Sequence, residues 1–143
     1  MVSCSHPKPG SVIKMDQEII NGNRKALLAA QQGEVDAVLM YNRLAAVVPE
    51  ADAAVFRQLA ADEGRHASVF HSYTQTVLQP KETKAKLIPF LYKTIGKAKT
   101  YRLIADGEYS AAKKYQTLVC TFADVRSVME DESRHGDTVM ALI

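Results

Sequence analysis

Two segments of the chain carry the same short motif, a glutamate followed three residues later by a histidine. Glu63 and His66 form the first copy, and Glu132 and His135 form the second. On an α-helix, residues three apart lie about 300° around the axis and about 4.5 Å along it, so both side chains of a pair can reach one point beside the helix. Carboxylate oxygens and imidazole nitrogens are common ligands of divalent metal ions. The two copies therefore predict a metal site.

Each motif belongs to a longer repeat within the chain. Upstream of each copy, a Gly-Glu pair is followed by a tyrosine seven residues after the glutamate, which gives Glu34 with Tyr41 and Glu108 with Tyr115. Equivalent positions of the two halves lie 69 to 74 residues apart. Two helical hairpins of one design, related by a pseudo-two-fold axis, would bring four glutamates and two histidines together at the centre of a bundle. The candidate metal ligands are Glu34, Glu63, His66, Glu108, Glu132 and His135.

The charge of this set favours metal binding over a buried polar network. Four carboxylates in a bundle core would each cost several kcal/mol to desolvate if they stayed unpaired. Two divalent cations would cancel their charge. A carboxylate-rich set with one imidazole per ion suits iron or manganese, and the lack of thiolates argues against a structural zinc site. We therefore expect a dinuclear site.

The first two helices that must position these residues can be read from hydrophobic periodicity. Residues 15–48 lack proline and repeat one face at every seventh position, which predicts a single long helix. That face consists of Ile20, Leu27, Glu34, Tyr41 and Val48. A second helix follows Pro49 and is expected to end at Pro80, because proline interrupts helices. Its inward face consists of Phe56, Leu59, Glu63, His66, Phe70, Tyr73 and Val77.

The second half of the chain begins with a crossover. The segment up to about Lys97 contains Pro89 and Gly96, so it predicts a connection with room for one short helix. A third helix carries Tyr101, Glu108 and Tyr115 at seven-residue spacing, and a fourth carries Val125, Val128, Glu132, His135, Val139 and Leu142. The turn between them lies somewhere between Tyr115 and Phe122, where no glycine or proline marks its position.

These elements predict an all-α fold. Alternation of apolar and polar residues is weak throughout, which argues against strands. Two helical hairpins joined by a long crossover describe a four-helix bundle of the ferritin-like topology. We expect residues 1–14 to be a flexible lead-in and residues 15–143 to form the bundle.

Composition narrows the class of protein. The 143 residues are 47% hydrophobic and 24% charged, with a net charge of +2 and no long basic run, so neither a disordered chain nor a nucleic-acid-binding surface is indicated. No apolar stretch predicts a signal peptide or a membrane helix, and we expect a cytoplasmic protein.

The two cysteines, Cys4 and Cys120, exclude a disulfide framework and paired Cys-x-x-Cys sites, and fit a reducing compartment. Cys120 is expected to be a small buried apolar residue.

Over residues 15–143 the repeat resembles the di-iron carboxylate proteins of the ferritin-like superfamily. The Gly-Glu pairs and the inward tyrosines look most like the di-iron domain of rubrerythrin. That resemblance implies two iron ions, with Glu34 and Glu108 as terminal ligands, Glu63 and Glu132 as bridging ligands, and His66 and His135 as one nitrogen ligand for each ion. Asp62 and Asp131 precede the bridging glutamates in a pattern that resembles the Asp-Glu-x-Arg-His motif of several di-iron oxygenases, which implies that each aspartate holds a ligand histidine by its other ring nitrogen; the alternative is an ordinary exposed acid beside an exposed arginine.

Two pairs of residues beside the ligands admit two interpretations each. The hydroxyls of Tyr41 and Tyr115 could hydrogen-bond ligand carboxylates and supply protons or an electron in catalysis, or the two side chains could serve in packing alone. Gly33 and Gly107 cost helix stability, which indicates either a close approach of helices or room for a substrate.

The resemblance implies an oxidoreductase that reduces hydrogen peroxide or dioxygen. Ala111 stands where a typical rubrerythrin has an extra carboxylate, and the paired cysteines of a rubredoxin-like domain are missing, so electrons are expected from a separate donor such as a rubredoxin or a reductase. We expect a homodimer with no nucleic-acid or membrane partner. Two alternatives stay open: ferrous iron oxidation and storage, and oxygenation of an organic substrate, which would require an open apolar pocket at the site.

Overall fold

The computed structural model describes residue 4 and residues 12–143, and the side chains of residue 4 and residues 17–143. This part of the chain contains six helices and no strand, which confirms the all-α class. The helices are α1 (Val12–Gly22), α2 (Arg24–Ala45), α3 (Glu50–Thr74), α4 (Thr83–Ile95), α5 (Lys97–Tyr115) and α6 (Val125–Met140). The flexible lead-in that we expected over residues 1–14 is wrong for residues 12–14, which belong to α1, and apart from residue 4 the rest of it lies outside the described residues.

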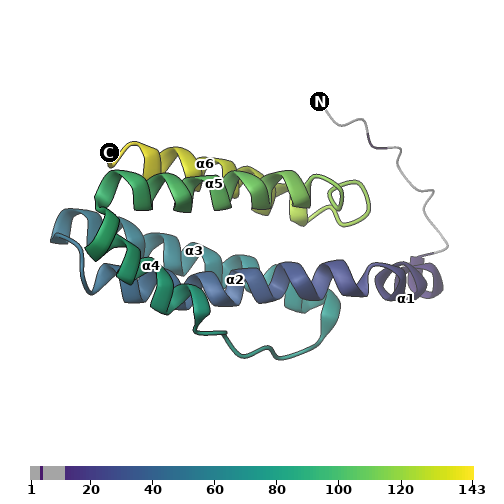
Figure 1. Ribbon diagram of the computed structural model, residues 1–143. Helices are drawn as coiled ribbons and strands as arrows, with labels where there is room; N and C mark the ends of the chain where they lie inside the picture. Colours follow the sequence, from purple (N-terminus) through teal and green to yellow (C-terminus); the bar gives the residue numbers. More distant parts are fainter. Residues whose placement is uncertain (1–3, 5–11) are drawn as a thin grey trace.

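Four of these helices form the bundle. Figure 1 shows α2 and α3 as one antiparallel hairpin and α5 and α6 as a second, laid against the first. The crossover that joins the hairpins contains α4, which packs beside α2 and leads directly into α5. The predicted arrangement of two hairpins joined by a long crossover with one short helix is therefore confirmed.

The helix predicted over residues 15–48 is two helices with a break at Asn23. Gly22 and Asn23 are poor helix formers, and the Asn23 side-chain amide donates a hydrogen bond to the Ile19 carbonyl at 2.8 Å. This bond uses a carbonyl at the end of α1 and lets α2 start in a new direction (Figure 1). Because α2 ends at Ala45, Val48 lies outside the helix in which we had placed it.

The second helix ends six residues before Pro80, where we had expected its end. Gln75 follows Thr74 in the left-handed conformation, with φ of 53°. Polar side chains of α2 then bind the chain that follows: the Gln31 amide donates to the Thr76 carbonyl at 2.7 Å, and Asp36 accepts from the Lys81 N–H at 2.6 Å. Val77, assigned to the inward face, is 79% exposed as a result.

The remaining connections agree with the sequence pattern more closely. Gly96 separates α4 from α5 with a φ of 88°, a conformation that glycine adopts without strain. The turn between α5 and α6 occupies residues 116–124, slightly beyond the predicted interval, and α6 begins at Val125 as expected.

The core consists of two apolar clusters with a polar layer between them. One cluster, near one end of the bundle, includes Tyr41, Phe56 and Tyr101. The other, toward the opposite end, includes Phe70 and Tyr115. Buried acids and histidines from all four bundle helices lie between these clusters. The fold thus keeps water away from the polar layer on both sides along the bundle axis.

A disulfide joins Cys4 to Cys120 and connects the amino-terminal segment to the turn between α5 and α6. Cys120 is exposed, so the expectation of a small buried residue at this position was wrong. Disulfides are rare in reducing compartments, so this pair counts against the compartment that the cysteine count indicated. Within the described residues, no helix has the length and apolar character needed to cross a membrane.

Candidate metal centre

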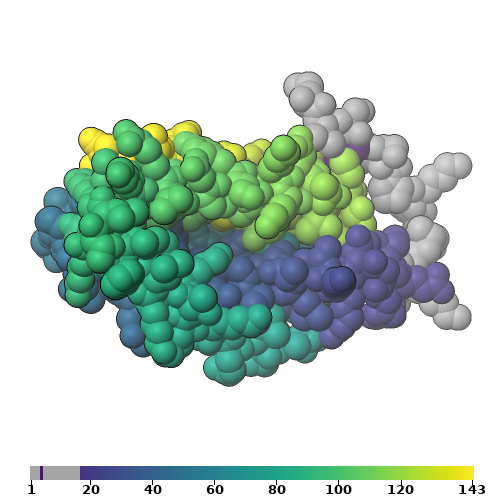
Figure 2. All heavy atoms as spheres, viewed as in Figure 1, coloured from purple at the N-terminus to yellow at the C-terminus, as the bar shows by residue number. Residues whose placement is uncertain are grey.

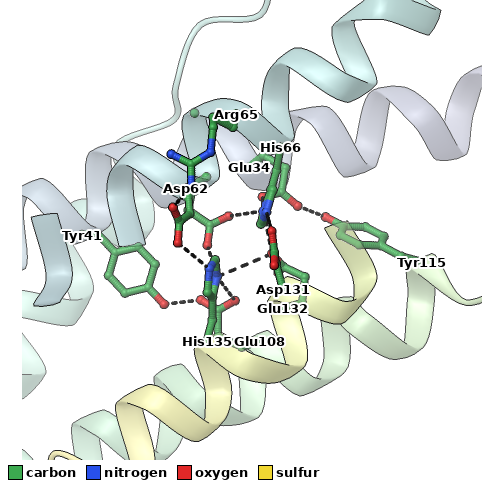
Figure 3. A network of polar contacts seen from close by, with 12 residues as sticks. Glu34, Tyr41, Asp62, Arg65, His66, Glu108, Tyr115, Asp131, Glu132 and His135 are labelled. Carbon is green, nitrogen blue, oxygen red and sulfur yellow. Dashed lines mark hydrogen bonds and ion pairs between the residues drawn. The ribbon is translucent and has the colours of Figure 1, made fainter. Parts of the chain in front are cut away.

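The structure brings all six candidate ligands together at the centre of the bundle, and Figure 3 labels all of them except Glu63. Glu34 comes from α2 and Glu108 from α5, while α3 and α6 each supply a Glu-x-x-His pair. Every one of the six side chains is buried. The i, i+3 spacing therefore places both members of each pair on the inner face of its helix, as helical geometry requires.

His66 faces carboxylates from three helices. Its Nδ1 atom lies 2.9 Å from Glu132 Oε1, 3.4 Å from Glu34 Oε2 and 3.6 Å from Glu63 Oε2. These four side chains surround one point on the α2 side of the polar layer.

His135 has a matching set of neighbours. Its Nδ1 atom lies 3.0 Å from Glu63 Oε1, 3.7 Å from Glu108 Oε2 and 3.8 Å from Glu132 Oε1. Glu63 and Glu132 therefore lie near both imidazoles, whereas Glu34 and Glu108 each lie near one. The arrangement has the form of two terminal and two shared carboxylates around two points.

Three buried polar atoms of this group lack a hydrogen-bond partner within the described part of the chain. They are Glu34 Oε2, His66 Nδ1 and Glu132 Oε1. These atoms lie close together, but the angles between them do not allow hydrogen bonds. A buried polar atom without a partner lowers the stability of the fold. A cation between them would satisfy all three. Together with the ligand atoms of Glu63, His66, Glu132 and His135, which lie within 4.8 Å of one another, this fits a di-iron site.

The electrostatics of the cluster lead to the same conclusion. Burial raises the pKa of Glu34 well above its usual range and that of Glu132 to about 8. Burial opposes the charged form of both histidines, but the carboxylates outweigh it and raise the pKa of His66 to about 11 and that of His135 to about 10. The cluster therefore holds protons at neutral pH where cations could replace them.

An aspartate from the opposite hairpin fixes each histidine. His66 Nε2 lies 2.9 Å from Asp131 Oδ2, and His135 Nε2 lies 3.1 Å from Asp62 Oδ2. A carboxylate only accepts hydrogen bonds, so Nε2 carries the proton and Nδ1 is directed at the glutamates. Each aspartate also forms an ion pair with the arginine three residues after it, Arg65 and Arg134. The sequence indicated these aspartates but not that each one crosses to the other hairpin.

The two inward tyrosines cross between hairpins in the same way. Tyr41 donates a hydrogen bond to Glu108 Oε1, and Tyr115 donates one to Glu34 Oε1 (Figure 3). Burial raises the pKa of both phenols, so both stay protonated and act as donors. Their hydroxyls therefore do contact candidate ligand carboxylates. Seven-residue spacing could not reveal the partner, because each bond joins residues in different halves of the chain.

A cavity of about 690 Å³ reaches the cluster from the side opposite the histidines. All four glutamates and Tyr115 contribute to its lining, together with Gly33 and Gly107. A Cβ atom at either glycine would have nothing within 4 Å, so these glycines leave open space rather than allow close helix packing. The wall that α4 contributes could not be predicted from the sequence, because the crossover carries no recognisable motif.

One of the comparisons with known proteins found a match. The family model described as Rubrerythrin matches residues 25–143. This range contains all six candidate ligands and both tyrosines. No curated protein and no solved structure matches the chain.

Proposed function

The chain belongs to the rubrerythrin family, whose domain is the ferritin-like di-iron domain, and from this we propose an oxidoreductase that reduces hydrogen peroxide or dioxygen. The observation that carries the proposal is the buried cluster in which each histidine Nδ1 faces three carboxylates. Glu34 and His66 would hold one iron and Glu108 and His135 the other, with Glu63 and Glu132 shared. Manganese accepts the same ligands.

Two bound iron ions would supply the two electrons that reduce the O–O bond of a peroxide, and a separate donor would restore them. Reduction of one peroxide to two waters also consumes two protons. Tyr41 and Tyr115 each hold a proton on a hydroxyl that contacts a glutamate of the cluster, so they would supply protons there. Asp62 and Asp131 keep the imidazoles oriented, and the cavity admits the oxidant from the glutamate side.

Oxygenation of an organic substrate is the second candidate function. One observation favours it: the cavity at the glutamates is open and mainly apolar, which is the pocket that such a reaction requires. Storage of iron would use the same cluster but would require a closed shell of many subunits. We propose instead a small oligomer, a homodimer.

The oxidation rate of the reduced protein tests the primary proposal. Protein loaded with ferrous iron without oxygen is mixed with hydrogen peroxide or with air-saturated buffer, and absorbance is followed by stopped flow. We expect peroxide to oxidise the site much faster than dioxygen, and size-exclusion chromatography to give a dimer. A large shell that forms a mineral core on addition of ferrous iron would contradict the proposal and indicate storage.

The tyrosines can be tested with a matched control. Replacing both Tyr41 and Tyr115 by phenylalanine is expected to slow peroxide reduction by at least about a hundredfold, since a positioned proton donor typically contributes about 10²- to 10⁴-fold. Iron content should stay the same. Tyr73→Phe is the control, because Tyr73 bonds Asp124 at 3.2 Å outside the cluster. Equal rates in the double variant and the control would show that the two tyrosines serve in packing alone.

A further inference from the structure

The cavity beside the glutamates has mainly apolar walls from three helices. Figure 2 shows the face on which α4, α5 and α2 meet, and the cavity lies between them. Ala30 and Ala37 of α2, Leu87 and Leu91 of α4 and Leu103 of α5 line it. Its volume of about 690 Å³ falls within the range of pockets that bind small organic molecules. Hydrogen peroxide and dioxygen need far less room.

Small residues keep this space open next to the cluster. Ala30, Gly33 and Ala37 lie on one face of α2, and Gly107 and Ala111 lie on one face of α5, all of them in the lining. Larger side chains at these positions would fill the cavity, and the glycines in particular would accept a Cβ without any clash. The small residues thus create a space that a ligand can fill.

Two lysines provide the cavity with positive charge. Apart from the four glutamates of the cluster, Lys84 of α4 and Lys114 of α5 are its only charged lining residues among those described. Both are exposed, and neither forms an ion pair within the described part of the chain. Their ammonium groups are therefore free to bind an anion, and their apolar stems extend the walls.

We propose that this cavity binds a small organic anion with an apolar body, such as a medium-chain carboxylate. Its charged group would lie at Lys84 and Lys114, and its apolar body would lie along α2, α4 and α5 toward Glu34 and Glu108. When bound metal ions neutralise the four glutamates, the apolar walls and the unpaired lysines together select this chemistry over a cation or a small polar molecule. Binding does not depend on the proposed reaction, so the two can fail separately.

A second copy of the chain is the rival occupant. Leu87 is 48% exposed and Leu103 is 50% exposed, so the mouth of the cavity is an apolar surface that another protomer could cover. An interface there would exclude a small ligand. The experiment must therefore measure ligand binding and the oligomeric state on the same samples.

The charge of the ligand is tested first. Calorimetry measures binding of dodecanoate and of dodecyltrimethylammonium, both below the concentrations at which they form micelles. We expect only dodecanoate to bind, and Lys114→Glu to weaken it about fivefold, the scale of a partly exposed ion pair. Lys113→Glu is the matched control, since Lys113 neighbours Lys114 but does not line the cavity. Equal binding of the cation, or equal loss in both variants, would overturn the proposal.

The place of binding is tested by filling the cavity. Gly33→Leu and Gly107→Leu should each weaken dodecanoate at least about tenfold, because the new side chain occupies the space of the ligand's apolar body. Gly64→Leu is the control. Gly64 lies in a helix next to a cluster glutamate, and a Cβ there would have nothing within 4 Å, but Gly64 does not line the cavity. Iron content and helicity of each variant show whether the fold survives.

The outcomes separate the rival occupants. Dodecanoate binding that both filling variants abolish and Gly64→Leu leaves intact supports the proposal. No dodecanoate binding by a folded, iron-loaded parent overturns it while leaving the proposed reaction standing. A dimer that Gly33→Leu converts to monomer, without dodecanoate binding by the parent, would instead assign the surface to a second copy of the chain.

Discussion

The α2–α3 hairpin and the α5–α6 hairpin offer the same side chains to the cluster but are packed differently around them. In the second hairpin, a Cβ at Gly136 would lie 2.5 Å from Cε1 of Tyr109, whose hydroxyl bonds Asp137 at 2.5 Å. Val35 and Ala67 occupy the equivalent positions of the first hairpin. The two halves therefore have the same residues at the cluster positions but different residues one position further along the chain.

What the hairpins share is the set of contacts that cross between them. Asp62 reaches His135 while Asp131 reaches His66, and Tyr41 reaches Glu108 while Tyr115 reaches Glu34. Neither hairpin alone could orient its own histidine or satisfy its own terminal glutamate. The site is therefore a property of the two hairpins together.

The largest effect is expected at a shared glutamate. Glu63 lies near both histidines, so Glu63→Ala should remove both irons, whereas His66→Ala should remove about one. Iron per chain is measured after anaerobic reconstitution with ferrous iron.

The control for this pair is Glu130→Ala, since Glu130 is an exposed residue of α6. It should retain all the iron. Equal losses in Glu63→Ala and His66→Ala would mean that Glu63 is not shared between the two ions.

A smaller effect is expected from the crossing aspartates. Asp62→Asn should weaken iron binding by about 10- to 100-fold at one ion only, because it frees the imidazole of His135. In the His135→Ala background the same change should add nothing, and in the His66→Ala background it should keep its full effect. Competition with a chelator measures both. Equal effects in the two backgrounds would contradict the crossed arrangement.

The smallest effect concerns the packing that differs between hairpins. Gly136→Ala should destabilise the fold by about 1 kcal/mol, because Tyr109 must move and lose its bond to Asp137. With Tyr109→Val also present, the alanine should instead stabilise by about 0.5–1 kcal/mol through helix propensity. Gly64→Ala, with open space, should stabilise in any background. Urea unfolding measures all of these, and the same sign for Gly136→Ala in both backgrounds would show that Tyr109 imposes no constraint.

The sequence predicted what depends on local spacing. Glu63 and His66 are three residues apart and therefore share one helix face. The internal repeat predicted the same arrangement for the second pair, and the six candidate ligands and the two hairpins could both be predicted from it. The crossed partners could not be predicted, since the contact of Tyr41 with Glu108 depends on how two distant hairpins dock. Nor could the end of α3 at Thr74, which α2 side chains such as Gln31 determine through bonds to the following segment.

Features that arise from the crossover and from the amino-terminal segment also could not be predicted from the sequence. The cavity exists because α4 lies over α2 beside α5, and nothing in the α4 sequence indicates where that helix docks. The disulfide between Cys4 and Cys120 joins residues 116 positions apart, a pairing that two cysteines in a sequence do not predict.

The central claim is that the two hairpins together hold two metal ions, and metal content with thermal stability tests it most directly. Protein reconstituted with ferrous iron without oxygen should contain two irons per chain, and a chelator should lower its thermal midpoint because binding energy becomes folding energy. The claim would be contradicted if the protein held less than one ion per chain, if the chelator left its thermal midpoint unchanged, and if Glu63→Ala raised that midpoint. Only protons would then neutralise the cluster.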